Sequence, residues 1–347
     1  MTLVLFLAVT LWGIGMVLKA PLRARLVMLA VLWLAVVGLH LVLPDTHSLR
    51  QETGGSAAPW LLLGGGVALV LVYRSGLDWL RRRARPQVGP EATGTFSDTE
   101  LNRYARHIVL REIGGKGQKK LKNAKVLVIG AGGLGSPALL YLAAAGVGTI
   151  GVIDDDEVDN SNLQRQVIHT DAAIGMPKVF SAQKTMEAQN PYVQVRPYNR
   201  RLTPELAANL FAEYDLILDG TDNFATRYLS NSVAVAQGKP LISGALSQWE
   251  GQISVFDPTN GAPCYQCIFP EAPAPGLAPS CSEAGVIGPL PGVIGAMMAV
   301  EVIKLITGAG AALRGEMLIY DALWGETRKI ALKSRPDCPV CGDLTRS

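Results

Sequence analysis

The sequence predicts a doubly wound α/β sheet preceded by transmembrane helices. Two observations lead to this prediction. Three apolar runs without Lys, Arg, Asp or Glu lie within the first 73 residues, and strand-like and helix-like segments alternate after them. The first of those strands leads into a glycine-rich turn, which is typical of such sheets. The chain has 347 residues, 49% of them hydrophobic, which is long enough for both parts.

The apolar runs cover residues 2–18, 26–43 and 57–73. As helices they would span about 25–27 Å each, close to the roughly 30 Å core of a bilayer. Residues 1–83 are therefore predicted to form a membrane segment with three transmembrane helices. Residues 84–96 are then a Pro/Gly/Thr-rich linker, and residues 97–347 the α/β domain. The alternative for the first run is a cleaved signal peptide, which its lack of a basic start disfavours.

Charge predicts the orientation of this segment. Lys19, Arg23 and Arg25 follow the first run, and five arginines lie within residues 74–85 after the third. By the positive-inside rule these stretches face the cytoplasm, so we expect a multi-pass inner-membrane protein with its α/β domain in the cytoplasm. Residues 1–90 hold nine Lys/Arg and three Asp/Glu, a balance of +6, which leaves −3 for the rest of a +3 chain. The basic charge therefore suits anionic headgroups, and no nucleic-acid partner is expected.

The elements of the α/β domain follow in order. Ser97 and Glu100 have the spacing of a capping box, which predicts a helix over "SDTELNRYARHIVL". A strand over residues 125–129 precedes the glycine turn, and a helix then runs to Gly146. Further strands are expected in "GTIGVID", "DLILDGTDN", "PLISGAL" and "QISVFDP", and a helix in "GVIGAMMAVEVIKLITG", with a more antiparallel tail.

The glycine turn predicts a phosphate site. Gly130, Gly132 and Gly135 fit G-x-G-x-x-G, in which backbone N–H groups at a helix start attract phosphate. Asp154 lies 24 residues after Gly130, at a strand end where an acid meets ribose hydroxyls. NAD, FAD and ATP all remain possible on these residues alone.

Polar residues downstream favour ATP with Mg²⁺ over NAD. Arg165 and Lys178 supply the positive charge that an attacked triphosphate needs. A carboxylate beside phosphates requires a Mg²⁺ between them, and Asp222 is the preferred candidate. Asp219, at the end of the same strand, is the alternative.

The cysteines predict a metal site. Cys264 with Cys267 and Cys338 with Cys341 form two C-x-x-C pairs in a reducing compartment, which together suit one closed, tetrahedral structural Zn²⁺ site. That site would attach the C-terminal tail to the region after "QISVFDP". Cys281 is left over and follows the Pro/Ala-rich residues 270–280.

The motifs "RYARHIVL", "VLVIGAGGLGSP", "NSNLQRQ", "GMPK", "DGTDN", "CYQC", "CSEAGVIGPLPGVIG" and "CPVCG" occur in this order. Over residues 97–342 the chain resembles the MoeB/ThiF/HesA family within the ubiquitin-activating superfamily, which includes molybdopterin-synthase adenylyltransferases. The resemblance implies a Rossmann-like domain that uses ATP and Mg²⁺. It also implies adenylation of the C-terminal glycine of a MoaD-like sulfur carrier ending in Gly-Gly, with release of pyrophosphate.

The resemblance also implies roles for single residues. Nucleotide contacts are expected from Gly130, Gly132, Gly133, Gly135, Asp154, Asn162, Arg165, Lys178, Asp222 and Asn223. Arg106 resembles an arginine that each subunit of a homodimer supplies to the other, and Cys281 stands where relatives carry a cysteine that can link to the carrier. His107 replaces the usual Gln, a mild departure.

Other functions remain open at this point. Adenylation of ThiS in thiamine biosynthesis is as compatible with these motifs as the molybdenum-cofactor pathway. A non-catalytic membrane scaffold for a ubiquitin-like partner and a tethered NAD(P) oxidoreductase are the remaining alternatives. For Cys281, a passive buried thiol is the alternative to a covalent link with the carrier.

Overall fold

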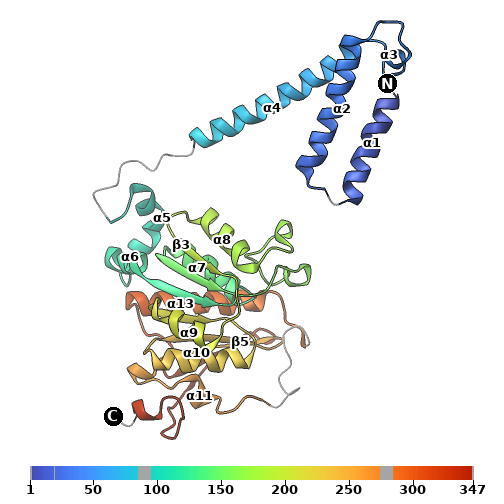
Figure 1. Cartoon of the computed structure of the whole chain (residues 1–347). Coiled ribbons are helices and arrows are strands. Elements are labelled where there is room, and N and C mark those ends of the chain that lie inside the picture. Colours follow the sequence, from blue (N-terminus) through green and yellow to red (C-terminus); the bar gives the residue numbers. More distant parts are fainter. Residues whose placement is uncertain (1, 19, 85–94, 274–283, 346–347) are drawn as a thin grey trace. The chain divides into compact units, whose positions relative to one another are not determined.

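The computed structural model describes residues 2–18, 20–84, 95–273 and 284–345. The chain divides into two compact units, Met1–Glu91 and Ala92–Ser347 (Figure 1). Most of the linker predicted over residues 84–96 lies outside the described residues.

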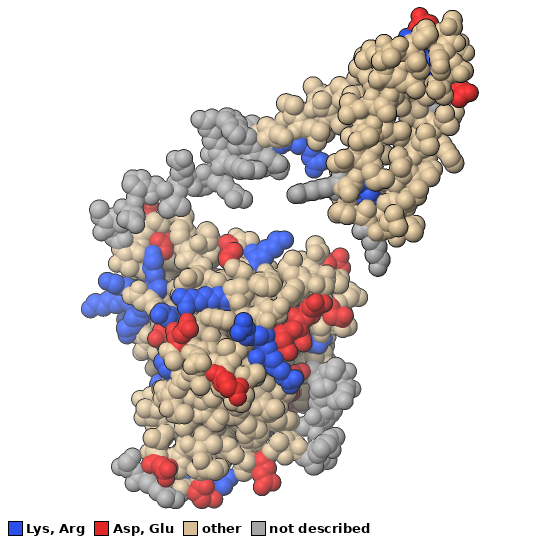
Figure 2. Space-filling view, viewed as in Figure 1, with Lys and Arg blue, Asp and Glu red and all other residues tan. Residues whose placement is uncertain are grey.

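The N-terminal unit is helical, and its described surface carries few charges (Figure 2). Its helices are α1 (Thr2–Val17), α2 (Leu22–Val42), the short α3 (Ser48–Glu52) and α4 (Ala58–Ala84). The stretches Ala24–Val42 and Ala58–Leu77 are long and apolar enough to cross a membrane, whereas α1, with 16 residues, is shorter than such a span. A helix thus lies at each of the three apolar runs, and the three crossings themselves stay a prediction.

The second unit contains an eight-stranded sheet in the order β3-β2-β1-β4-β5-β6-β7-β8. The strands are β1 (Lys125–Ile129), β2 (Thr149–Ile153), β3 (Gln194–Tyr198), β4 (Leu216–Asp219), β5 (Leu241–Leu246), β6 (Glu250–Phe256), β7 (Glu316–Asp321) and β8 (Glu326–Ala331). Strands β3 to β5 in this order are parallel, and β5 to β8 are antiparallel. The α/β prediction and its antiparallel tail are therefore confirmed.

Helices cover both faces of the sheet (Figure 1). The described helices of this unit are α5 (Asp98–Ile108), α6 (Gly114–Asn123), α7 (Gly135–Ala145), α8 (Lys178–Gln189), α9 (Pro204–Ala212), α10 (Phe224–Ala236), α11 (Tyr265–Ile268) and α13 (Pro289–Thr307). Alternate residues of β1 explain the two layers. Val126 and Val128 belong to the core with α7, α8 and α13, and Leu127 and Ile129 belong to the core with α9 and α10.

The helix boundaries follow the predicted signals. Ser97 caps α5 in a capping box, with the Ser97 N–H donating to Glu100 Oε2 at 2.9 Å. Helix α7 ends at Gly146, whose φ of 79° is a left-handed conformation that favours glycine.

Strands β3, β7 and β8 are not predicted individually by the sequence analysis. Strand β3 lies at one sheet edge and contains Pro197, which lacks the N–H that a ladder uses. Strand β8 lies at the other edge with all six residues exposed, so it has no apolar alternation to identify it.

Candidate functional site

A cavity of about 780 Å³ opens at the carboxyl ends of β1, β2 and β4. This is where strand order reverses in a doubly wound sheet, because β2 and β4 lie on opposite sides of β1. Nine predicted nucleotide contacts line the cavity: Gly130, Gly132, Gly133, Asp154, Asn162, Arg165, Lys178, Asp222 and Asn223. The structure thus brings together residues that lie up to 93 positions apart (223 − 130).

The glycine turn is held by backbone contacts. The Gly130 N–H donates to Ile153 O at 2.9 Å, and its φ of 92° lies in the region that favours glycine. Gly135 does not line the cavity, which differs from its expected nucleotide contact. A Cβ at Gly135 would lie 1.9 Å from Gly130 O, so this glycine permits close packing of the α7 start against the turn.

Asp154 ties the end of β2 to the glycine turn. Its Oδ2 accepts from the Ala131 N–H at 2.7 Å, and its Oδ1 accepts from the Asp156 N–H at 2.9 Å. Burial raises the pKa of Asp154, while the positive charge of Lys178 and these two N–H groups oppose the rise. The carboxylate is therefore oriented before any ribose arrives.

The two predicted cations are held by local partners. The buried Lys178, the first residue of α8, places Nζ 2.7 Å from Asp156 Oδ2. Arg165 donates from one terminal nitrogen to Asn162 Oδ1 at 2.8 Å and from the other to Ser161 O at 3.2 Å. Both side chains stand at the cavity wall, where phosphate oxygens would meet them.

The structure distinguishes between the two acids after β4. Asp219 is fully buried, and its Oδ1 accepts from the N–H and the hydroxyl of Thr221 at 2.9 and 2.7 Å. Asp222 is exposed and lines the cavity, as the sequence analysis preferred. Asn223 uses its side-chain oxygen to cap α10 through the Thr226 N–H at 2.8 Å.

Sequence reasoning missed three further arginines of the cavity. Arg200 and Arg201 follow β3, the edge strand that was not predicted. Arg227 on α10 is buried and donates to Gly244 O at 2.7 Å and Ser243 Oγ at 3.1 Å. For Arg200 and Arg201 the sequence offered only the motif "NRR" after "VQVRPY". No clearly apolar strand precedes that motif, so nothing placed it at the end of a strand.

Of the two remaining predicted catalytic residues, one lies within the described chain and one does not. Arg106 is exposed on α5 and does not line it, so a contribution to another subunit stays a prediction. Cys281 lies outside the described residues.

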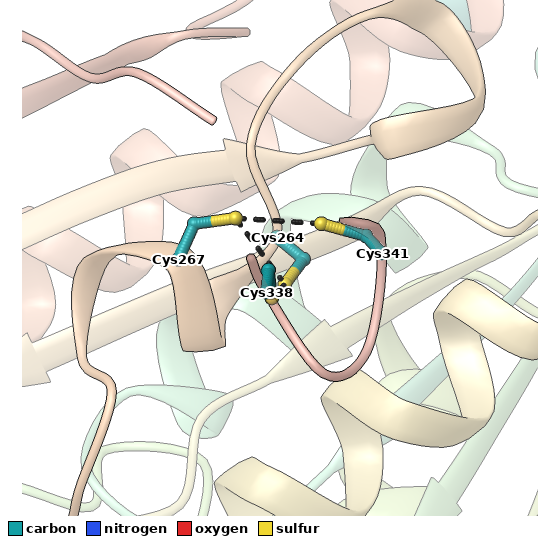
Figure 3. Close-up of side chains that lie close together, drawn as sticks. All are labelled: Cys264, Cys267, Cys338 and Cys341. Atoms are coloured by element: carbon teal, nitrogen blue, oxygen red, sulfur yellow. Dashed lines mark hydrogen bonds between the residues drawn. The ribbon is translucent and has the colours of Figure 1, made fainter. Parts of the chain in front are cut away.

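The four paired cysteines form one buried cluster, as their spacing predicted. Figure 3 shows the thiols of Cys264 and Cys267 facing those of Cys338 and Cys341. The Sγ atom of Cys264 lies 3.8 Å from that of Cys267 and 3.6 Å from that of Cys338. The Sγ atoms of Cys267 and Cys341 are 3.3 Å apart. Thiolates on a tetrahedral Zn²⁺ stand about 3.8 Å apart, given a Zn–S bond of about 2.3 Å.

The electrostatics of the cluster also suit a cation. Burial raises the pKa of the Cys264 thiol to about 11 and raises that of Cys341 as well, whereas at Cys338 hydrogen bonds outweigh burial and lower the pKa. Buried thiolates therefore need a compensating positive charge, which a structural Zn²⁺ would provide. Donor type, spacing and burial all fit a closed site with no open position.

Comparison with known proteins identifies the family. The family model described as "ThiF family" matches residues 104–340, which is more than half of the chain. The chain belongs to the ThiF family. A ThiF-type relative named sulfur carrier protein adenylyltransferase, from Thermus thermophilus, is 51% identical over 252 residues, covering 72% of this chain and 93% of the relative.

Other relatives are similar over a comparable share of this chain. The SAMP-activating enzyme E1 of Haloferax volcanii is 46% identical, covering 72% of this chain and 92% of the relative. The probable adenylyltransferase/sulfurtransferase MoeZ of Mycobacterium tuberculosis is 52% identical, and this chain spans only 66% of its length. Among solved structures, E. coli MccB with ATP has a TM-score of 0.58 at 25% identity, covering 70% of this chain and 74% of MccB.

Proposed function

We propose that this ThiF-family enzyme uses ATP to adenylate the C-terminal glycine of a ubiquitin-like sulfur carrier and releases pyrophosphate. The observation that carries the proposal is the single cavity in which the glycine turn, Asp154, Arg165, Lys178 and Asp222 meet. Relatives of 46–52% identity are named for this type of activity, and one of them is covered over 93% of its length.

The reaction requires positioning and charge neutralisation. The carrier's carboxylate attacks the α-phosphate in line, and pyrophosphate leaves, so that step needs no protein nucleophile. The N–H groups of the glycine turn and the cations of Arg165 and Lys178 offset the negative charge that develops on the phosphates. Lys178 exchanges its contact with Asp156 for one with a phosphate in this proposal.

Asp222 fits a Mg²⁺ role because its exposed carboxylate faces the cavity that would hold the phosphates. A bound Mg²⁺ would neutralise charge on the leaving pyrophosphate. Asp154 would accept from the ribose hydroxyls, and the four-cysteine cluster would hold a structural Zn²⁺ away from the reaction.

The carrier is proposed to be of the MoaD type, in molybdopterin biosynthesis, with ThiS of the thiamine pathway as the competing substrate. We further propose a homodimer in which Arg106 of one subunit reaches the nucleotide of the other. Helices α1, α2 and α4 would anchor the enzyme in the inner membrane with the catalytic unit in the cytoplasm, supported by their apolar surfaces.

ATP–pyrophosphate exchange tests the proposal on the full chain in detergent. We expect exchange only with Mg²⁺ and a carrier ending in Gly-Gly, and none with a carrier that lacks the final glycine. A MoaD-type and a ThiS-type carrier tested side by side identify the pathway by their relative rates. No exchange with any Gly-Gly carrier, in protein that is folded and zinc-loaded, overturns the assignment.

A further inference from the structure

His169 is a buried histidine outside the predicted site, and both of its ring nitrogens have partners. Its Nε2 lies 2.9 Å from Ala131 O, within the glycine turn, and its Nδ1 lies 2.9 Å from Ser181 Oγ on α8. The side chain is 6% exposed, and Ser181 is 3% exposed. A carbonyl oxygen only accepts, so Nε2 carries a proton. Burial lowers the pKa of His169 and favours the neutral ring, in which Nδ1 accepts from the Ser181 hydroxyl.

The contact with Ala131 fixes the direction of a phosphate-binding N–H. No described peptide bond is cis, and in a trans peptide the C=O and the following N–H point in opposite directions. With Ala131 O held on His169, the Gly132 N–H points the other way, and Gly132 lines the cavity. Within the described chain, the N–H groups of Gly132 and Gly133 have no hydrogen-bond acceptor, so both remain available to a ligand.

Among the residues that the structure describes, no other group duplicates this contact well. The Ser136 hydroxyl also points to Ala131 O, but at 3.5 Å it lies beyond ordinary O–H···O distances. On the other side of the same residue, the Ala131 N–H is already donated to Asp154. His169 therefore binds the C=O of Ala131, and Asp154 binds its N–H.

His169 also connects the turn to the helix that carries Lys178. Ser181 lies in the first turn of α8, three residues after Lys178. A second hydrogen bond, from Thr185 Oγ1 to Ile168 O at 2.9 Å, joins the same helix to the residue before His169. The imidazole thus links the N–H donors of the glycine turn to the cation at the start of α8.

We propose that His169 is a positioning residue for nucleotide binding, which orients the Ala131–Gly132 peptide toward the phosphates and couples it to α8. The inference rests on the proposed function only in taking the phosphate ligand to be ATP. A positioning contact of this kind is set before the ligand binds, so its loss should weaken affinity for ATP more than it changes the fold.

Two amide variants of the full chain test the proposal. Gln places its Nε2 near that of histidine, so His169→Gln keeps a donor for Ala131 O. His169→Asn is shorter, reaches only the Nδ1 position, and leaves Ala131 O without that donor. Calorimetric titration with Mg²⁺-ATP, without carrier, should give a Kd within about threefold of wild type for Gln and raised about tenfold or more for Asn.

A second measurement does not depend on ATP. Hydrogen exchange of the Ala131 amide, which donates to Asp154, should be faster in the Asn variant than in the Gln variant, with circular dichroism showing both folded. Unchanged ATP affinity in the Asn variant, or equal weakening in both variants, overturns the positioning role. If wild type binds no ATP, the proposed function fails, and the exchange rates alone decide on His169.

Ser181→Ala provides a smaller perturbation if the Asn variant does not fold. It removes the hydroxyl that holds Nδ1 while leaving a small, helix-compatible residue in α8. We expect the Kd for ATP to rise about threefold and the hydrogen-bonded Ala131 amide to exchange faster. No change in either quantity would also overturn the proposal.

Discussion

The apolar stretches of helices α4 and α13 have similar hydropathy but different exposure. The α13 stretch Pro289–Thr307 has a higher mean hydropathy than Ala58–Leu77 of α4, and both are long enough to cross a membrane. Yet half of the α13 stretch is buried in its own unit, against 6% for α4. Helix α13 packs on the sheet beside α7, while α4 exposes Leu62, Leu69 and Val72 along its length.

The buried carboxylate of Glu301 also fits α13 to a protein core. Glu301 on α13 accepts from the Leu313 N–H at 2.9 Å and pairs with Lys304 at 2.5 Å. A membrane span would have no such backbone partner for an acid. The comparison shows that apolar composition alone does not distinguish a candidate membrane span from a helix buried in a protein core, because the difference lies in what packs against the helix.

The largest expected effect lies in the cavity of the second unit. Asp222→Ala and Arg165→Ala should each lower ATP–pyrophosphate exchange by about 10²-fold or more, because each removes preorganised charge from the phosphates. Arg196→Ala is the matched control for the arginine, since Arg196 does not line the cavity and, among the described residues, pairs with the exposed Glu213 at 3.1 Å. Unchanged exchange in both cavity variants would show that this cavity is not the adenylation site.

Loss of a cysteine ligand should lower stability before it affects chemistry. We expect one Zn²⁺ per chain, and Cys338→Ser should lower zinc content and the melting temperature, because a closed metal site contributes to folding. Metal analysis and thermal unfolding of the same preparations measure both effects. Freshly purified, folded protein without zinc contradicts this prediction.

Cys281 should matter less for exchange than the cavity residues. Adenylation is an attack on ATP by the carrier's carboxylate, so Cys281→Ala should keep exchange within about a few-fold. A covalent carrier–enzyme adduct on a non-reducing gel should disappear in that variant. A collapse of exchange would place Cys281 in the adenylation step or the fold, and a persisting adduct would make it a bystander.

The smallest effect on exchange is expected from separating the two units. Removal of residues 1–85 takes away no cavity residue, so exchange should stay within about twofold while the protein moves from the membrane fraction to the soluble one. Reporter fusions at residue 50 and at the C-terminus should give opposite signals in the full chain. Cytoplasmic signals from both fusions would contradict three crossings.

The sequence by itself determined the alternating strands and helices, the glycine turn, the capping box at Ser97 and the pairing of four cysteines into one cluster. These features depend on the spacing of residues that are close in the sequence, and that spacing can be read from one sequence alone. The sequence did not determine β3 and β8. These edge strands bury few side chains, so their sequences carry no apolar pattern that identifies a strand.

The tertiary structure decided which polar residues share the cavity. Asp219 and Asp222 are alike in sequence, but only the direction of the chain after β4 buries one and exposes the other toward the cavity. Arg200, Arg227 and His169 reach the same region from separate elements, so their roles depend on long-range packing that local spacing does not encode. The same holds for α13, whose apolar sequence suits a membrane and whose packing against the sheet gives it a protein interior instead.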